Sequence, residues 1–484
     1  MSVVNAAAKE NKKTYIHVII MFILGAVTSV LPPFGQITAL GMDVLAVFVM
    51  LVYGWIFVDL LWISLLGFFL LAMTGAVTVQ EAFITCFSNQ TVIITIVVIS
   101  LAAGLNELGI GEAISDFMLS RKFIVGRPWA LIVALVALAF VLSLIGKGMI
   151  GCILLWTIVA NILNTCGYED RSPLMSFMLC MLFFGGMIPM YVAPYQPMIL
   201  MFSTFYQIGT EIVQPFGVYY ILGALLYAVV FLLMILIARF VLRIDASKFN
   251  ITEEMRLDYA SKKPSKVTKV AMVALFGYIA VLVVPEFLPA QNAVVAALKK
   301  VGILGWSVLY LAIFSLWRDK ETGKPILNLQ KCFSQIQWSM VMLMGVTLPL
   351  GNLLGSAEIG IMATITQYVK PLVGGFGVTG FYIFCFIFLG ILTQVLHNMV
   401  LGVVFMPLFG GVGLSMGCNP YVLFFLMFIA LNTAYATPAG CGSCGLLYGN
   451  TQIKRSHAFL WGTILIVVTL IVGILMLPLL NAML

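Results

Sequence analysis

Charged side chains are scarce in this 484-residue chain. Asp, Glu, Lys and Arg make up 9% of the residues and only three histidines are present, whereas charged residues are about 25% of a typical soluble domain. Hydrophobic residues reach 62%, and no soluble core could bury that much apolar surface. The composition therefore excludes a soluble enzyme, a secreted scaffold and a nucleic-acid-binding protein. It predicts a polytopic membrane protein.

Sequence motifs of nucleotide hydrolysis and of zinc metalloproteases are also missing. No Walker A or HExxH sequence occurs, which argues against an ATP-driven pump and an intramembrane metalloprotease. The nine cysteines lie almost entirely in apolar runs, so we expect buried thiols rather than a disulfide framework. Cys441 and Cys444 have CxxC spacing, but no second such pair accompanies them. We expect no enzymatic activity, no cofactor and no metal centre.

Apolar runs long enough to cross a bilayer, which takes about 20 residues, recur along the chain. Two further apolar stretches, 128–166 and 377–413, are interrupted in the middle, and their arms are short for full crossings. Broken backbone at membrane depth is tolerated only where it is buried in protein or lines a cavity, so we predict two re-entrant hairpins in an all-α fold. Eleven spans are expected, at 15–34, 42–57, 58–76, 91–107, 174–202, 217–243, 269–288, 302–317, 338–355, 421–449 and 458–482.

The positions of Lys and Arg predict the orientation. With eleven crossings and a cytoplasmic N-terminus, only Lys299, Lys300 and Lys370 of the 25 basic residues lie outside, and only Lys147 lies within the membrane. This asymmetry satisfies the positive-inside rule. The C-terminus is then outside, the first hairpin enters from the cytoplasm, and the second enters from outside. We expect the protein in the cell (inner or plasma) membrane.

The two hairpins occupy similar places in two halves of the chain. Their break points, Lys147 and His397, are 250 positions apart, and a Pro/Gly-rich interruption follows each hairpin, at 189–196 and 438–444. The polar segment 245–268 separates the halves as a cytoplasmic linker. Two similar halves joined across an odd number of crossings have opposite orientations, and paired broken segments in inverted repeats indicate the binding site of a transporter.

Lys147, between Gly146 and Gly148, is the most informative residue of the first break. A lysine at the bilayer centre costs about 2.5–3.5 kcal/mol, and no carboxylate lies near either break in the sequence. The ammonium group could snorkel to the cytoplasmic face. Alternatively it binds an anion, which free backbone N–H groups at the glycines and nearby helix N-termini would also attract.

His397, Asn398 and Met399 stand at the matching place in the second half. A lone histidine in an apolar run is often a hydrogen-bonded core residue, but its position opposite Lys147 in the repeat favours a functional role. Asn398 can donate two hydrogen bonds to a carboxylate. Both breaks are therefore suited to an anionic substrate.

This layout resembles the divalent anion/sodium symporter family, the INDY-type dicarboxylate carriers. Members of that family carry Ser-Asn-Thr at both hairpin tips, whereas this chain reads Gly146-Lys147-Gly148 and His397-Asn398-Met399, so that only Asn398 matches. At the later breaks the family has Gly-Thr-Pro-Pro-Asn and Ala-Thr-Pro-Pro-Asn. Here the corresponding segments run from Val192 to Gln196 and from Gly440 to Cys444.

The departures from the family pattern affect the sodium ligands most. In the family, the tips and later breaks bind sodium ions and the tips also hold the substrate carboxylates. The resemblance implies that Lys147, together with protonated His397, replaces the sodium charges, as in the sodium-independent exchangers of the family. Former cation sites would lie at Ala193, Gln196, Cys441 and Cys444. Substrate would contact Gly146, Lys147, Gly148, His397, Asn398, Met399, Pro438 and Ser443.

The resemblance also implies an elevator mechanism and a homodimer. Segments 128–244 and 377–484 would form the moving transport domain, and segments 1–127 and 269–376 the scaffold. The function that follows is sodium-independent exchange of C4–C5 dicarboxylates such as malate, succinate, fumarate or 2-oxoglutarate. A sodium- or proton-coupled symporter of di- or tricarboxylates is the alternative, and an anion channel with Lys147 as its selectivity charge is less favoured.

Overall fold

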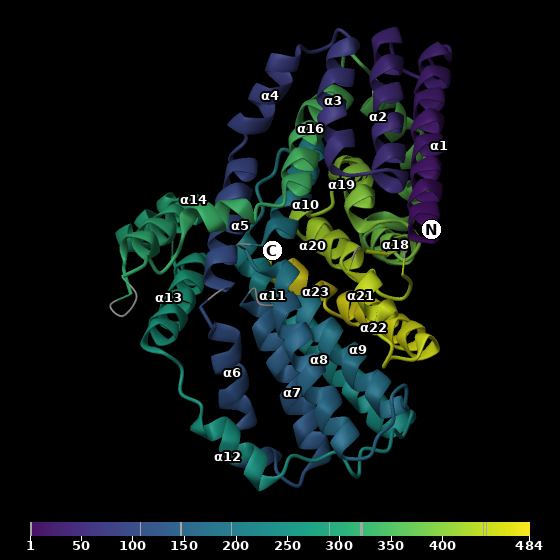
Figure 1. The fold of residues 1–484 in the computed structure, drawn as a ribbon. Helices are drawn as coiled ribbons and strands as arrows, with labels where there is room; N and C mark the ends of the chain where they lie inside the picture. The colour runs from purple at the N-terminus through teal and green to yellow at the C-terminus, as the bar shows by residue number, and fades with distance from the viewer. Residues whose placement is uncertain are drawn as a thin grey trace.

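The chain is built of helices (Figure 1). A computed structural model describes residues 2–106, 108–145, 148–194, 196–289, 291–319, 323–438, 440–441 and 443–484. Within these ranges the one strand-like feature is an isolated bridge between Arg318 and Pro325. The prediction of an all-α fold is confirmed over the described residues.

The first four helices form the upper part of Figure 1, where α1 and α2 run side by side, and α5 leads down to α6 in the lower part. Local sequence determines where they begin: the Thr38 hydroxyl accepts a hydrogen bond from the Gly41 N–H, and Thr78 and Glu81 form a capping box. The elements are α1 (Ser2–Val30), α2 (Ala39–Phe57), α3 (Leu61–Met73), α4 (Val79–Ser88), α5 (Gln90–Asn106), α6 (Ile110–Leu119) and η1 (Lys122–Ile124).

The first predicted hairpin consists of α7 (Pro128–Leu144) and α8 (Gly148–Thr165), which pack against each other and against α9 (Pro173–Met187). Proline opens α7 and α9, where its missing N–H costs no intrahelical hydrogen bond. The chain continues through η2 (Pro189–Val192), α10 (Pro197–Thr210), α11 (Phe216–Leu236) and the π-turn η3 (Ile237–Val241).

The polar linker contains α12 (Glu253–Ser261), which crosses the lower end of the molecule. The Arg256 guanidinium donates hydrogen bonds to both carboxylate oxygens of Glu253, at 2.6 and 2.9 Å. It also donates a hydrogen bond to the carbonyl oxygen of Ser120 at 3.1 Å. Hydrogen bonding from Arg256 holds the pKa of the Glu253 carboxyl below its usual range. The linker is thereby attached to the end of α6.

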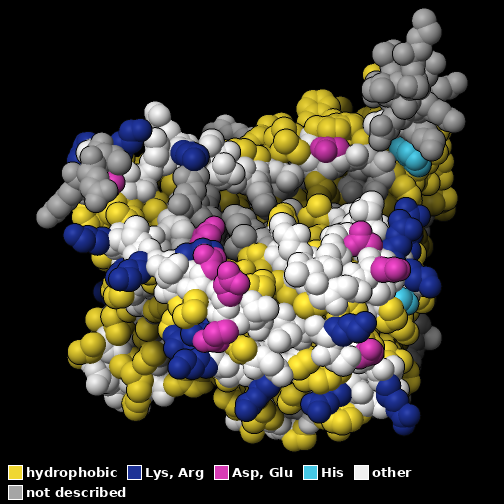
Figure 2. Space-filling view, turned by 60° about the horizontal axis from the view of Figure 1, so that its bottom comes forward, with side chains coloured by type: hydrophobic (Ala, Val, Ile, Leu, Met, Phe, Trp, Pro, Cys, Tyr) yellow, Lys and Arg dark blue, Asp and Glu magenta, His cyan; other side chains and the backbone are white. Residues whose placement is uncertain are grey.

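The face at this lower end is rich in charge. Figure 2 shows Lys and Arg side chains distributed over it, with Asp and Glu side chains between them. The connection from α6 to α7, the connection from α8 to α9 and the helix α12 lie here (Figure 1), and the sequence assigns these three segments to the cytoplasmic side. The grouping is the one that the positive-inside rule requires, while the identity of the two sides stays a prediction.

The second scaffold segment predicted from the sequence is also helical. Its first long helices project to one side in Figure 1 and pack against α11 and α5. The elements are α13 (Lys266–Val283), η4 (Val284–Phe287), α14 (Ala293–Leu316), α15 (Leu329–Ser334), α16 (Trp338–Gly355), α17 (Ile361–Val373) and η5 (Gly374–Phe376).

The second predicted hairpin consists of α18 (Gly377–Leu392) and α19 (Asn398–Ser415), and both helices pack against α20 (Pro420–Leu431). An irregular segment follows α20 and leads into α21 (Cys444–Gly449) and α22 (Arg455–Leu475). The chain ends with α23 (Leu477–Met483).

Helices α9 and α20 lie in the interior. Every residue from Leu174 to Met187 is buried, and so is every residue from Val422 to Leu431. An apolar helix of a membrane protein can also face lipid, so it is the packing of neighbouring helices that places α9 and α20 inside the protein. Each predicted hairpin packs on one of these two buried helices, so the interruptions that follow α9 and α20 also lie inside the protein.

Eight helices of the described chain are long and apolar enough to cross a membrane, or nine if α4 and α5, bent by 60°, form one span. One of the eight is α19 of the second predicted hairpin. A polytopic membrane protein is thus confirmed. The count of eleven spans and the inverted repeats stay predictions.

Gly209 marks the closest approach between α10 and α19. A Cβ atom there would lie 2.2 Å from the carbonyl oxygen of Pro407. Alanine is favoured over glycine in a helix by about 1 kcal/mol, but overpacking costs about 1–3 kcal/mol. We therefore expect Gly209→Ala to lower the unfolding temperature of the purified protein. Gly411→Ala in α19 is the control, since its nearest Cβ contact is 3.5 Å, and equal unfolding temperatures for the two variants would contradict the packing.

Candidate functional site

The turn of the second hairpin is hydrogen-bonded to the interruption after α20, mainly through Gln394. The Gln394 side-chain nitrogen donates to the carbonyl oxygens of Gly390 (2.9 Å) and Thr433 (3.0 Å), and its Oε1 accepts from the N–H of Ala436 (3.0 Å). Backbone groups in a broken membrane segment need partners inside the protein. The side-chain amide of Gln394 forms a hydrogen bond with three such backbone groups.

Two further bonds join the same segments. The Thr393 hydroxyl donates to the carbonyl oxygen of Leu431 at 3.2 Å, and the Asn398 N–H donates to that of Gly440 at 3.3 Å. Position 440 needs a glycine, because a Cβ atom there would clash with the carbonyl oxygen of Ala434 at 2.5 Å. The second tip and the second interruption, which the sequence treats as one site, are therefore in direct contact.

Two buried amide oxygens at this site have no hydrogen-bond partner among the described residues. They are Oδ1 of Asn398 and Oδ1 of Asn432, on side chains that are 3% and 1% exposed. The Asn432 side-chain nitrogen donates to the carbonyl oxygen of Phe428 at 2.8 Å. An unsatisfied buried acceptor costs about 1–3 kcal/mol. Both oxygens are thus suited to accept a hydrogen bond from a donor or to coordinate a cation.

His397 caps the N-terminus of α19. Its Nδ1 accepts a hydrogen bond from the Met399 N–H at 3.3 Å, which requires an unprotonated Nδ1 and places the ring proton on Nε2. The positive end of the helix dipole also disfavours an imidazolium at this position. In this arrangement His397 offers an Nε2–H donor, and the positive charge expected from the sequence stays a prediction.

The interruption after α9 is equally irregular. The Ser143 hydroxyl at the end of α7 accepts a hydrogen bond from the Met190 N–H at 2.7 Å, so the first hairpin contacts this segment. Gln196 is 5% exposed and donates its N–H to the carbonyl oxygen of Ala193 at 2.9 Å. Gly148 begins α8, whereas Gly146 and Lys147 lie outside the described residues.

The two interruptions meet each other. The hydroxyl groups of Tyr191 and Tyr435 are 3.2 Å apart, and the ring of Tyr435 packs edge-on against Phe183 of α9 at a centroid distance of 5.6 Å. Sequence reasoning missed this pair. Its signal is the Tyr-x-x-Pro pattern that opens at Tyr191 and again at Tyr435.

The remaining predicted residues lie in the second interruption, at 438–444. Cys441 Sγ lies 3.2 Å from Cys444 Sγ and 3.1 Å from the Ser443 hydroxyl, and the Cys444 thiol donates to the carbonyl oxygen of Ala434 at 3.0 Å. Both cysteines are free thiols. Pro438 is exposed. The structure therefore brings together Asn398, Ser443, Cys441 and Cys444 around one irregular segment.

A family model described as citrate transporter matches residues 45–430 of the chain. This range includes both hairpin tips and most of the sequence, and it confirms the resemblance to carboxylate carriers. The chain belongs to the citrate transporter family, which makes it a secondary transporter rather than an enzyme.

Two solved transporter structures are similar in fold. The match with the YdaH transporter of Alcanivorax borkumensis covers 83% of this chain and 88% of YdaH, with a TM-score of 0.53 and 14% identity. The match with MtrF from Neisseria gonorrhoeae, described as one of a class of antimetabolite efflux pumps, covers 96% of this chain and 94% of MtrF. Its TM-score is 0.57 and the identity is 14%. No individual curated protein matches the chain.

Replacement of Gln394 tests the bonding of the second tip. Gln394→Leu keeps the approximate volume but leaves the N–H of Ala436 and the carbonyl oxygen of Thr433 without this partner. We expect a lower unfolding temperature, because each unsatisfied buried group costs about 1–3 kcal/mol, and a loss of transport. Gln394→Glu, which keeps Oε1 as an acceptor, should be less damaging to the Ala436 bond. Unchanged stability of Gln394→Leu would show that these bonds do not hold the tip.

Proposed function

We propose that this protein exchanges C4–C5 dicarboxylates, among them malate, succinate, fumarate and 2-oxoglutarate, across the cell membrane without sodium. Its membership in the citrate transporter family carries this proposal, because the matched range includes the hairpin tips that would hold the carboxylates. The family description also makes citrate, a tricarboxylate, a candidate substrate.

The substrate site combines one fixed charge with two helix N-termini. Helices α8 and α19, of 18 residues each, both begin at a hairpin tip, and the N-terminus of a helix attracts anions. Lys147 supplies the full positive charge. The Asn398 side-chain nitrogen and the Nε2–H of His397 donate hydrogen bonds to the substrate carboxylates. Further contacts come from the other predicted site residues: Gly146, Gly148, Met399, Pro438 and Ser443.

Transport follows an elevator mechanism in a homodimer. Segments 128–244 and 377–484 move together, which agrees with the Tyr191–Tyr435 pair that joins them. Segments 1–127 and 269–376 form the scaffold, against which the transport domain slides where α10 packs on α16 and α5. The N-terminus is cytoplasmic and eleven crossings place the C-terminus outside.

A coupled symporter is the second candidate. The unpartnered oxygens of Asn398 and Asn432 favour it, because amide oxygens can coordinate a cation or accept the proton of a protonated carboxylic acid. The former cation positions Ala193, Gln196, Cys441 and Cys444 would then retain ligands only through their backbone carbonyl groups and the Gln196 amide.

Replacement of sodium separates the two candidates. We expect uptake of labelled malate, succinate or citrate by proteoliposomes to be unchanged when choline replaces sodium at constant pH, because both Ser-Asn-Thr tips are absent. Uptake into protein-free liposomes is the control. A steep dependence on sodium concentration would establish the symporter instead, and a dependence on the proton gradient alone would establish proton coupling.

Lys147→Gln tests the fixed charge. We expect it to reduce dicarboxylate transport at least about 10²-fold, because loss of one partner of a buried ion pair costs about 3–5 kcal/mol. The unfolding temperature without substrate should not fall, since an unpaired buried charge has been removed. Lys300→Gln, the same change at a position predicted to lie outside, should leave transport intact. Normal transport by a folded Lys147→Gln protein would mean that Lys147 only snorkels to the surface.

A further inference from the structure

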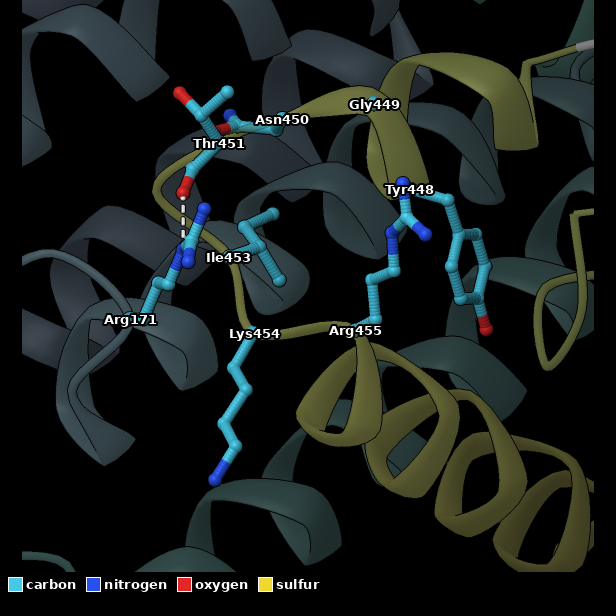
Figure 3. Close-up of a pocket in the computed structure, with 8 residues that line it drawn as sticks. All are labelled: Arg171, Tyr448, Gly449, Asn450, Thr451, Ile453, Lys454 and Arg455. Carbon is cyan, nitrogen blue, oxygen red and sulfur yellow. Dashed lines mark hydrogen bonds between the residues drawn. The ribbon is translucent and has the colours of Figure 1, made fainter.

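A second basic site lies outside the predicted transport site. A cavity of about 320 Å³ opens where the connection between α8 and α9 meets the connection between α21 and α22 (Figure 3). Three of its lining residues are cationic and none is acidic. The lining residues are Arg171, Tyr448, Gly449, Asn450, Thr451, Ile453, Lys454 and Arg455.

Arg171 is held in place by the opposite connection. Its N–H donates to the carbonyl oxygen of Gln452 at 2.9 Å and its Nε donates to that of Thr451 at 3.0 Å. Its backbone has a φ of 64°, a left-handed conformation that non-glycine residues rarely adopt and that persists only where surrounding contacts impose it. The two terminal nitrogens of the guanidinium form no hydrogen bond with the described residues, so this planar fork is available to a ligand.

The start of α22 concentrates further positive charge. Lys454 occupies the N-cap position without a side-chain capping bond, and Arg455 is the first residue of this 21-residue helix. Cations at a helix N-terminus are unfavourable because the helix dipole is positive there. Within the described chain no carboxylate lies within ion-pair distance of Arg171, Lys454 or Arg455. Asp170 beside them instead accepts a hydrogen bond from the Gln452 side chain at 3.0 Å.

We propose that this cavity binds an anion that carries phosphate or clustered carboxylate groups. Figure 3 shows the guanidinium groups of Arg171 and Arg455 extending toward the same side, along the segment from Tyr448 to Thr451, while the Lys454 side chain extends the other way. A guanidinium fork matches two oxygens of a phosphate or carboxylate. The bound anion neutralises the cations that the α22 N-terminus disfavours.

The site also reaches the transport machinery. The Tyr448 hydroxyl, from the cavity lining, donates to the carbonyl oxygen of Ala436, and the N–H of Ala436 is bonded to Gln394. An anion in the cavity therefore stabilises a segment that continues into the second interruption. This inference needs only the cavity and its charges and does not depend on which substrate is carried.

The test uses the purified full-length protein in neutral detergent, with inorganic pyrophosphate as the probe and sodium chloride at matched ionic strength as the reference. We expect a saturable rise in unfolding temperature. Arg455→Gln and Arg171→Lys should each raise the apparent dissociation constant about tenfold or more, because each removes a bidentate contact. Lys454→Gln, whose side chain extends away, should change it less. His397→Ala should leave the response intact, because His397 belongs to the transport site.

Two lipid compositions identify the natural source of the anion. In nanodiscs of phosphatidylcholine the pyrophosphate response should persist if the ligand is a soluble anion. If the ligand is a lipid headgroup, phosphatidylglycerol should raise the unfolding temperature of the wild-type protein but not of Arg455→Gln, and it should abolish the pyrophosphate response. An identical pyrophosphate response in wild-type protein and Arg455→Gln, or its loss in His397→Ala, would overturn the proposal.

Discussion

Backbone groups at a break in a membrane helix must find hydrogen-bond partners inside the protein, because hydrocarbon offers none. The arrangement of the second half follows from this requirement. The interruption after α20 is stabilised by the side chain of Gln394, which stands in the turn of the neighbouring hairpin. Because the partners of one break come from the other, the hairpin tip and the interruption form one unit that can move without losing its bonds.

The same constraint supports the binding site that we propose at the breaks. A helix that begins at membrane depth exposes N–H groups and the positive end of its dipole, and both α8 and α19 begin at hairpin tips. The protein then needs few charged residues to attract an anion, which is consistent with a composition that has 9% charged residues. The proposed role of Lys147 rests on the same reasoning, because no carboxylate lies near it in the sequence.

Much of this arrangement could be predicted from composition and periodicity. The hairpins at 128–166 and 377–413 correspond to α7–α8 and α18–α19, because glycine, lysine and polar residues interrupt otherwise apolar runs. The contact of Asn398 with Gly440 also agrees with a site shared by the tip and the later break. The hairpins follow from local sequence, and the shared site follows from the matching places of the breaks in the two halves of the chain.

Other features depend on tertiary packing and could not be predicted. Two partners of Gln394, Thr433 and Ala436, lie 39 and 42 positions away, and the pairing of Tyr191 with Tyr435 joins residues 244 positions apart. The role of His397 as the cap of α19, in which Nδ1 accepts a bond from the Met399 N–H, also depends on where the helix begins in the fold.

Obligate exchange is the central claim, because a lysine that stays in the site differs from a sodium ion that leaves with the substrate. In the proposed mechanism, return of the empty carrier would move an unpaired charge through the membrane at a cost of several kcal/mol, and each 1.4 kcal/mol slows a step about tenfold. The direct measurement is the initial rate of labelled dicarboxylate uptake at pH 7 into proteoliposomes that are empty or loaded with unlabelled dicarboxylate. Loaded vesicles should be faster by about 10²–10⁴-fold. Equal initial rates in empty and loaded vesicles would contradict the account.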